Sequence, residues 1–181
     1  MTPTSPNESE PMITDYVTGR SVPNVGAEAN RQDVERLLVE EKGYAPEEIS
    51  VDAPIDMEID GEIYRSRVDL VICLGPRPLM AVKCAAGNLD SRQREIVAAA
   101  RLLAPDRILP LAVASDGRSA IVWDGVSGKQ IGTGLAAIPH RSRLAAEFGS
   151  GKPPAPLDAE RLAREKLVFR SYDSMNVNTR R

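Results

Sequence analysis

The amino-acid sequence predicts one α/β domain with a mixed central sheet flanked by helices. The pattern of apolar residues carries this prediction: helical spacing over residues 27–42, strand-like alternation and apolar runs over 49–85, and helical spacing again over 90–104. The apolar run 108–115 predicts a further strand. Because a helix separates it from the preceding strand, the two can pair in parallel through a crossover. The expected order is helix, three strands, helix and strand, or α-β-β-β-α-β.

Two turn signals divide the middle of the chain into an antiparallel meander of three strands. Asp60-Gly61 is a strong signal for a tight hairpin between strands at 49–60 and 62–74. The next turn is Gly75-Pro76-Arg77, and a third strand follows at 79–85. The second strand begins with alternation and ends as the continuous apolar run LVICL. Such a run is typical of a strand whose end is covered on both faces.

The ends of the chain differ in composition from its middle, and this difference predicts the domain organisation. The start is polar and bears prolines, so residues 1–22 are expected to form a flexible N-terminal arm. Residues 23–148 form the globular domain. The proline-rich segment GSGKPPAP predicts a linker at 149–156. Residues 157–181 are then an extra C-terminal helix, over 157–172, and a basic tail.

Composition narrows the class of function. The 181 residues carry a formal net charge of −3, so overall charge does not attract the protein to DNA, and nucleic-acid binding needs a local basic patch. No apolar run approaches the roughly 20 residues that span a bilayer, and the N-terminus lacks the pattern of a secretory signal. Cys73 and Cys84 lie inside apolar runs, which predicts buried, reduced thiols in a cytoplasmic protein.

Two oppositely charged residues fall within the meander. If the turn at 75–77 closes symmetrically, Asp69 lies directly opposite Lys83, and Val71 lies opposite Ala81. A carboxylate and an ammonium then meet on a strand pair that is otherwise apolar. Sites that hydrolyse phosphodiesters with Mg²⁺ use such groups, the carboxylate to hold the metal and the lysine to stabilise developing charge. A buried ion pair that joins two strands is the structural alternative.

Several segments of the chain together resemble a known family. They are ITDYVTGRSVPNVGAEANRQDVERLLVEEKGY, RSRVDLVICL, PLMAVKC and SRQREIVAAARLL, and they look like the N-terminal domain of type I restriction enzyme R subunits in a small stand-alone form. The resemblance covers about residues 13–140. It implies a restriction-endonuclease-like core with α-β-β-β-α-β order. It also implies the PD-(D/E)xK signature, which is an aspartate on the second strand and Glu-x-Lys on the third.

Carried onto this sequence, the resemblance assigns candidate catalytic residues and shows a defect among them. The motif aspartate is Asp69, which would bind Mg²⁺, and the motif lysine is Lys83. A glutamate of the first helix often assists in the family, and here it is Glu28 or, as the second candidate, Glu35. The motif acid, however, is replaced by Ala81, which offers no oxygen ligand, and Val68 stands where the motif has proline. The signature is therefore degenerate.

These observations leave two functional hypotheses. The first is a degenerate nuclease-like domain that contacts DNA or a restriction-type assembly, with catalysis impaired or lost; if active, it is a Mg²⁺-dependent endodeoxyribonuclease. Arg65 and Arg67 share a strand face with Asp69 and are the candidate nucleic-acid contacts, although a solvated strand face explains them too. The second is a non-enzymatic module that forms a homodimer or binds a protein partner through a sheet edge or the terminal helix.

Overall fold

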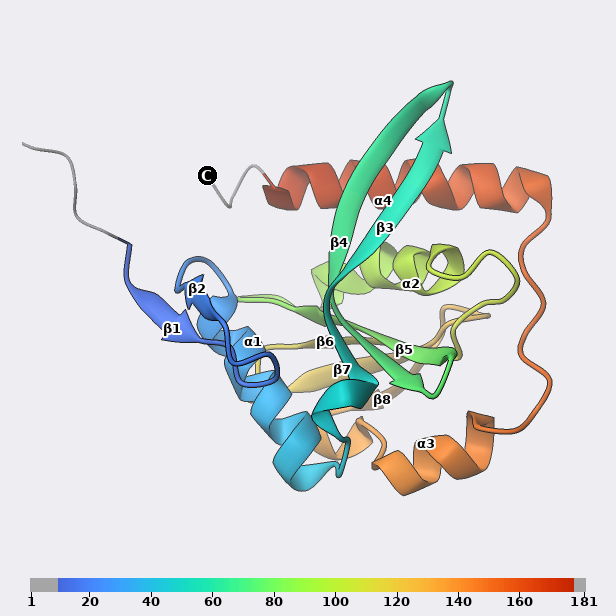
Figure 1. Ribbon diagram of the computed structural model, residues 1–181. Helices are drawn as coiled ribbons and strands as arrows, with labels where there is room; N and C mark the ends of the chain where they lie inside the picture. Colours follow the sequence, from blue (N-terminus) through green and yellow to red (C-terminus); the bar gives the residue numbers. More distant parts are fainter. Residues whose placement is uncertain (1–9, 178–181) are drawn as a thin grey trace, which may run out of the picture.

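A computed structural model describes residues 10–177 and has a six-stranded mixed sheet between two layers of helices (Figure 1). The strand order is β3-β4-β5-β6-β7-β8; β5 and β6 are parallel, and every other neighbouring pair is antiparallel. The predicted mixed sheet and the parallel pair across a helical crossover are confirmed. The strands of this sheet are β3 (Ile49–Ile59), β4 (Glu62–Leu74), β5 (Arg77–Cys84), β6 (Leu111–Ser115), β7 (Ala120–Asp124) and β8 (Gln130–Thr133).

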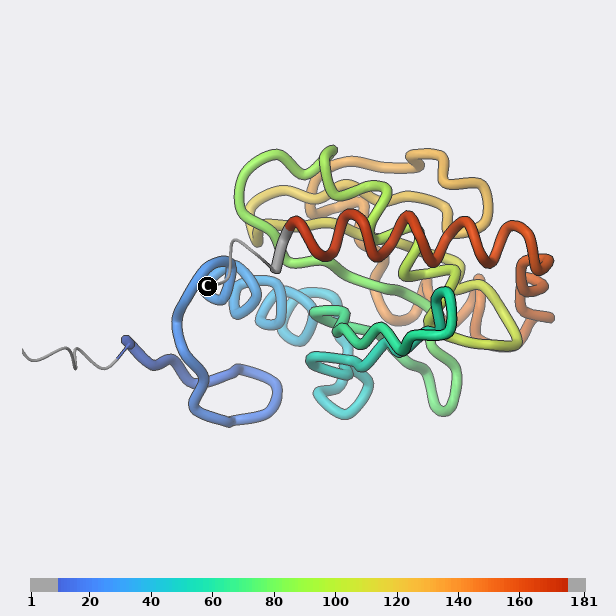
Figure 2. The backbone as a smooth tube through the Cα atoms, turned by 90° about the horizontal axis from the view of Figure 1, so that it is seen from above, coloured from blue at the N-terminus to red at the C-terminus, as the bar shows by residue number. Residues whose placement is uncertain are grey.

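Helices cover both faces of this sheet, with α2 and α4 on one side and α1 and α3 on the other (Figures 1 and 2). Both flanking helices and the extra C-terminal helix were expected. The helical segments are α1 (Glu28–Arg36), the π-helical turn η1 (Leu37–Glu41), η2 (Pro46–Glu48), η3 (Asp90–Arg92), α2 (Gln93–Leu102), η4 (Leu135–Ala137), α3 (Arg141–Phe148) and α4 (Ala159–Val177).

The two faces of the sheet are filled by different kinds of side chain. On the α1 side, branched residues and Tyr44 fill the space between helix and sheet. On the α2 side, small residues let the helix backbone lie close to the sheet. Such close packing excludes water from the side chains between the helix and the sheet. The small residues that meet there are Ala81, Ala112 and Ala114 of the sheet and Ala98, Ala99 and Ala100 of α2.

The long β3–β4 hairpin bends where it leaves the sheet. Leu70 belongs to the core on the α1 side, whereas Val68, two residues earlier on the same pleat face, belongs to the core on the α2 side. Asp69 lies between them. On β3 the backbone of Asp52 has a left-handed φ of 52°, which is unusual for a residue other than glycine. Beyond this bend the hairpin rises from the sheet beside α4 (Figure 1).

The predicted N-terminal arm is in part an ordered hairpin. Within the expected arm 1–22, residues 1–9 lie outside the described residues. The rest contains β1 (Met12–Thr14) and most of β2 (Ser21–Pro23), which pair antiparallel. Asp15 closes the turn between them by accepting hydrogen bonds from the backbone and hydroxyl of Thr18, both at 2.7 Å. Strands of three residues are too short to give a periodic signal, and this is why the sequence predicted an arm.

The C-terminal helix packs along α2 and the hairpin. It begins at 159 and extends to 177, beyond the expected end at 172; the basic tail 178–181 lies outside the described residues. Phe169 is buried in the α2-side core, and the hydroxyl of Tyr64 on β4 donates a 2.6 Å hydrogen bond to Asp173. Within residues 10–177, no helix is long and apolar enough to cross a membrane.

Candidate functional site

The β4–β5 register brings Asp69 and Lys83 together as predicted, but the turn between the strands differs from the expected one. A symmetric turn was predicted, but Leu74 pairs with Arg77 and a bulge follows between Ile72 and Cys73. The bulge restores the expected register further in, where Val71 pairs with Ala81. Asp69 and Lys83 therefore lie at the same level of the two strands, with Lys83 Nζ 3.6 Å from Asp69 Oδ2.

A third residue, Glu95 of α2, completes this group. Its Oε1 atom lies 2.9 Å from Lys83 Nζ, so the ammonium lies between two carboxylates. Asp69 Oδ2 also accepts a 2.7 Å hydrogen bond from the backbone N–H of Cys84. Asp69 and Lys83 are each 5% exposed and Glu95 is 3% exposed. We call Asp69, Lys83 and Glu95 the lysine cluster.

Sequence reasoning missed Glu95, although a signal for it exists. It stands directly before Ile96 and Val97, at the start of the apolar run of α2, and so lies within the part of the helix that the periodicity buries. A buried carboxylate needs a cation or several hydrogen-bond donors. Lys83 was already the candidate cation on the neighbouring strand. The missing step was the spatial one, that α2 lies directly over β5.

Ala81 is fully buried under α2, on the same face of β5 as Lys83. The position expected to hold the motif acid is thus a small apolar contact between strand and helix. It supplies no side-chain oxygen atom, and it is not among the residues that line the cleft beside the lysine cluster.

A cleft of about 340 Å³ opens beside the lysine cluster, where the β3–β4 hairpin leaves the sheet. Of the lysine cluster, only Asp69 lines this cleft; Lys83 and Glu95 lie behind it. The β2 strand and the chain leading into α1 form an apolar rim. The lining residues are Val22, Pro23, Val25, Ala27, Glu28, Arg31, Asp52, Arg67, Asp69 and Cys84.

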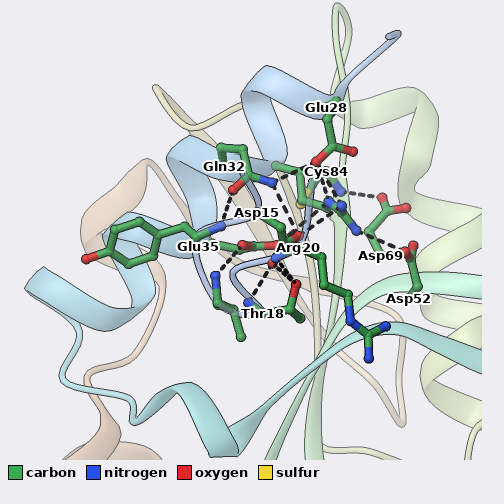
Figure 3. A network of polar contacts seen from close by, with 12 residues as sticks. Asp15, Thr18, Arg20, Glu28, Gln32, Glu35, Asp52, Asp69 and Cys84 are labelled. Carbon is green, nitrogen blue, oxygen red and sulfur yellow. Dashed lines mark hydrogen bonds and ion pairs between the residues drawn. The ribbon is translucent and has the colours of Figure 1, made fainter. Parts of the chain in front are cut away.

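A second group of charges, which we call the arginine cluster, lies at the α1 side of the cleft. Its centre is the guanidinium of Arg31, whose side chain is 7% exposed. Four carboxylates from the N-terminal hairpin, α1 and β3 surround it (Figure 3). They are Asp15 at 3.1 Å, Glu28 at 2.8 Å, Glu35 at 3.7 Å and Asp52 at 3.2 Å from the nearest guanidinium nitrogen.

Glu28, the expected assisting acid, lines the cleft, but its carboxylate accepts hydrogen bonds from two residues of its own helix. Its Oε1 accepts hydrogen bonds of 3.0 and 2.8 Å from Arg31 and one of 2.7 Å from Gln32. This is the pairing expected of an ordinary helix residue. The Glu28 carboxylate is therefore engaged by Arg31 and Gln32.

Glu35 is the most perturbed carboxyl of the arginine cluster. Burial, and next the nearby Asp15 carboxylate, raise its pKa to about 7. Its Oε2 accepts a 3.1 Å hydrogen bond from the backbone N–H of Val17, while Oε1 has no hydrogen-bond partner among residues 10–177. For Asp15, burial opposes ionisation, but hydrogen bonds from Thr18 and the charge of Arg31 prevail and lower its pKa. The two carboxyls thus differ in their readiness to hold a proton.

The two candidate nucleic-acid contacts lie in different places. Arg67 lines the cleft near Asp69. Arg65 lies further along the hairpin, with its side chain 74% exposed and its Nε atom 3.8 Å from Asp56. Arg65 is not among the residues that line the cleft, so the two arginines do not form one basic patch there.

The donors present do not fit the expected Mg²⁺ ion. Asp69 Oδ2 is already engaged by the backbone of Cys84 and the ammonium of Lys83. Ala81 contributes no ligand. Among residues 10–177, no group of three or more Asp, Glu, His or Cys side chains is arranged to hold a metal ion. Mg²⁺ prefers six oxygen ligands in near-octahedral geometry, and a lone, engaged carboxylate binds it weakly.

Comparison with known proteins identifies one family. The model of the type I restriction enzyme R protein N terminus (HSDR_N) matches residues 26–139. The match spans α1, the six-stranded sheet and α2; it contains the lysine cluster and leaves out Asp15 and the C-terminal helix. No curated protein and no solved structure matches the chain.

Proposed function

This chain belongs to the type I restriction enzyme R protein N-terminal family, and we propose that it is a nuclease-derived module that takes part in a restriction-type assembly without cutting DNA. We take its core to be of the restriction-endonuclease-like, PD-(D/E)xK type. The α-β-β-β-α-β order of the elements supports this, as does the meeting of Asp69 and Lys83 on adjacent strands.

The closure of the lysine cluster carries the proposal. A lysine that assists phosphodiester cleavage must reach the scissile phosphate. Here Lys83 lies between the carboxylates of Asp69 and Glu95, is 5% exposed and does not line the cleft. With Ala81 sealed under α2, neither a metal ligand nor a charged group is presented at the expected position. The ancestral charges now hold β4, β5 and α2 together.

Electrostatics favour protein contacts over DNA contacts. Glu28, Asp52 and Asp69 line the cleft together with Arg31 and Arg67, and the protein as a whole carries a net charge of −3. Phosphate binding requires an excess of local positive charge, because counterion release supplies most of its free energy. We therefore favour the other subunits of a restriction-type assembly as partners, with any DNA held mainly by them.

A cleavage assay tests the loss of catalysis. The full chain is incubated with linear, circular and single-stranded DNA in Mg²⁺ and in Mn²⁺, and no cleavage above a buffer control is expected. Cleavage that disappears in both Asp69→Ala and Lys83→Ala would overturn the proposal. Cleavage that persists in both variants would indicate a contaminating nuclease, and the assay would be repeated after further purification.

DNA contact is tested separately by a salt-dependent binding titration. Weak binding is expected, with Arg67→Ala reducing the slope of log K against log salt by about one if Arg67 meets a phosphate. Tight binding with a slope of several units would contradict the preference for protein partners. Light scattering tests the non-enzymatic homodimer, for which the exposed Leu167 and Met175 of α4 offer some apolar surface.

A further inference from the structure

We infer that the guanidinium of Arg31 is the resident cation of the cleft and stands in place of a divalent metal ion. The inference rests on the proposed loss of cleavage, because a cleaving enzyme of this type needs a metal beside Asp69. It adds a residue-level reason for that loss which does not involve Ala81.

The geometry around Arg31 is that of a cation held by converging carboxylates. Nη2 meets Asp15 and Glu28, Nη1 meets Asp52, and Nε faces Glu35. The four acids come from three separate parts of the chain: the hairpin before α1, α1 itself and β3. Planar guanidinium groups with several donors suit such sites, and they stay charged when buried. A protein-derived cation thus joins three segments without a bound ion.

The arginine cluster adjoins the expected metal site. Asp52 and Asp69 lie at the same level of β3 and β4, between the pairs Val51–Leu70 and Ala53–Val68. Asp52, Asp69 and Arg31 line the same cleft. A positive charge in this place repels a metal ion that approaches Asp69, and it engages Asp52 and Glu28, the two other acids that line the cleft.

The arginine cluster holds more negative charge than Arg31 alone balances. Four carboxylates face one guanidinium, an excess of negative charge if all are ionised. The raised pKa of Glu35 relieves part of this excess, since the buried carboxyl holds a proton more readily. A divalent ion would balance two of the carboxylates, whereas the single charge of Arg31 leaves the others to protonation or solvent.

The test is to remove the guanidinium and measure metal binding. Mn²⁺ alone is titrated into wild type, Arg31→Ala and Arg31→Lys, and the free ion is followed by electron paramagnetic resonance, with the thermal midpoint as a second readout. Arg143→Ala is the matched control, because it removes an arginine that pairs with a glutamate on exposed α3. We expect Arg31→Ala to bind one Mn²⁺ at least about tenfold more tightly than the other three proteins, with a rise in thermal midpoint.

Each result of the Mn²⁺ titration either supports or overturns the inference. Wild-type protein that binds Mn²⁺ as tightly as Arg31→Ala overturns the inference, and so does a folded Arg31→Ala variant that gains no affinity. If Arg31→Ala is unfolded without metal, recovery of its circular dichroism on adding Mn²⁺ supports the inference, and failure to recover counts against it. Mn²⁺ binding by wild type without DNA cleavage sinks only this inference, whereas Mn²⁺-dependent cleavage sinks the proposed function as well.

Discussion

Two groups of buried charge lie side by side in this molecule, and they differ in how they are closed. The lysine cluster joins β4, β5 and α2, with one ammonium between two carboxylates and with α2 packed over it. The arginine cluster joins the N-terminal hairpin, α1 and β3, with one guanidinium among four carboxylates at the edge of a cleft. The first is sealed by packing; the second is held together by its own charges.

This difference has consequences for the stability of each group. In the lysine cluster the surrounding alanines let α2 exclude solvent, so the ion pairs are costly to break singly. In the arginine cluster the excess of carboxylates must be relieved by protonation, so its stability depends on pH.

Lys83→Met should be the most destabilising change. It leaves the carboxylates of Asp69 and Glu95 buried without their ammonium, and removing one partner of a buried ion pair costs about 3–5 kcal/mol. Urea unfolding of wild type and variant measures the loss. Combining Lys83→Met with Glu95→Gln should recover part of it, because a neutral amide replaces one buried charge. Equal losses in the single and double variants would mean that the lysine cluster is not sealed.

Ala81→Glu restores the motif acid in sequence but should restore no cleavage. The new carboxylate would enter the alanine-lined contact under α2, so we expect a loss of about 3 kcal/mol in the free energy of unfolding. Ala81→Gln, which has a similar volume without the charge, is the control and should lose less. Mg²⁺-dependent cleavage by Ala81→Glu would show that this contact opens onto the cleft after all.

Glu35 should make the arginine cluster less stable as pH rises. Its folded-state pKa of about 7 lies above the ordinary glutamate pKa of 4.5, so the folded state binds the proton more tightly and loses stability as pH rises through 7. Between pH 5.5 and 8.5 this contribution is about 2 kcal/mol. Glu35→Gln should remove it, which is read from the difference in unfolding free energy between wild type and variant at the two pH values. A wild type whose pH dependence matches that of Glu35→Gln would refute the shifted pKa.

The fold was largely predictable from local patterns, whereas the composition of the site was not. Periodicity and turn residues placed the strands of the meander and both flanking helices, since each depends on residues near in sequence. The pairing of Asp69 with Lys83 followed from loop length, although a bulge and a different turn gave the same register. Glu95 and Asp15 could not be assigned, because their partners are brought to them only by helix packing and by a hairpin of very short strands.

Arg65→Ala should change the free energy of unfolding least. It tests whether an exposed charge on the β3–β4 hairpin interacts with the lysine cluster or the arginine cluster. Its side chain is 74% exposed and lies 3.8 Å from an exposed Asp56, and exposed ion pairs of this kind contribute from zero to about 1 kcal/mol. We expect a change below about 0.5 kcal/mol in urea unfolding and no change in the pH dependence assigned to Glu35. Arg67→Ala, at the cleft, should by contrast alter that pH dependence, because it removes a positive charge near the carboxylates of the arginine cluster. If the two variants behave alike, the position of Arg67 in the lining of the cleft does not distinguish it electrostatically from the exposed Arg65.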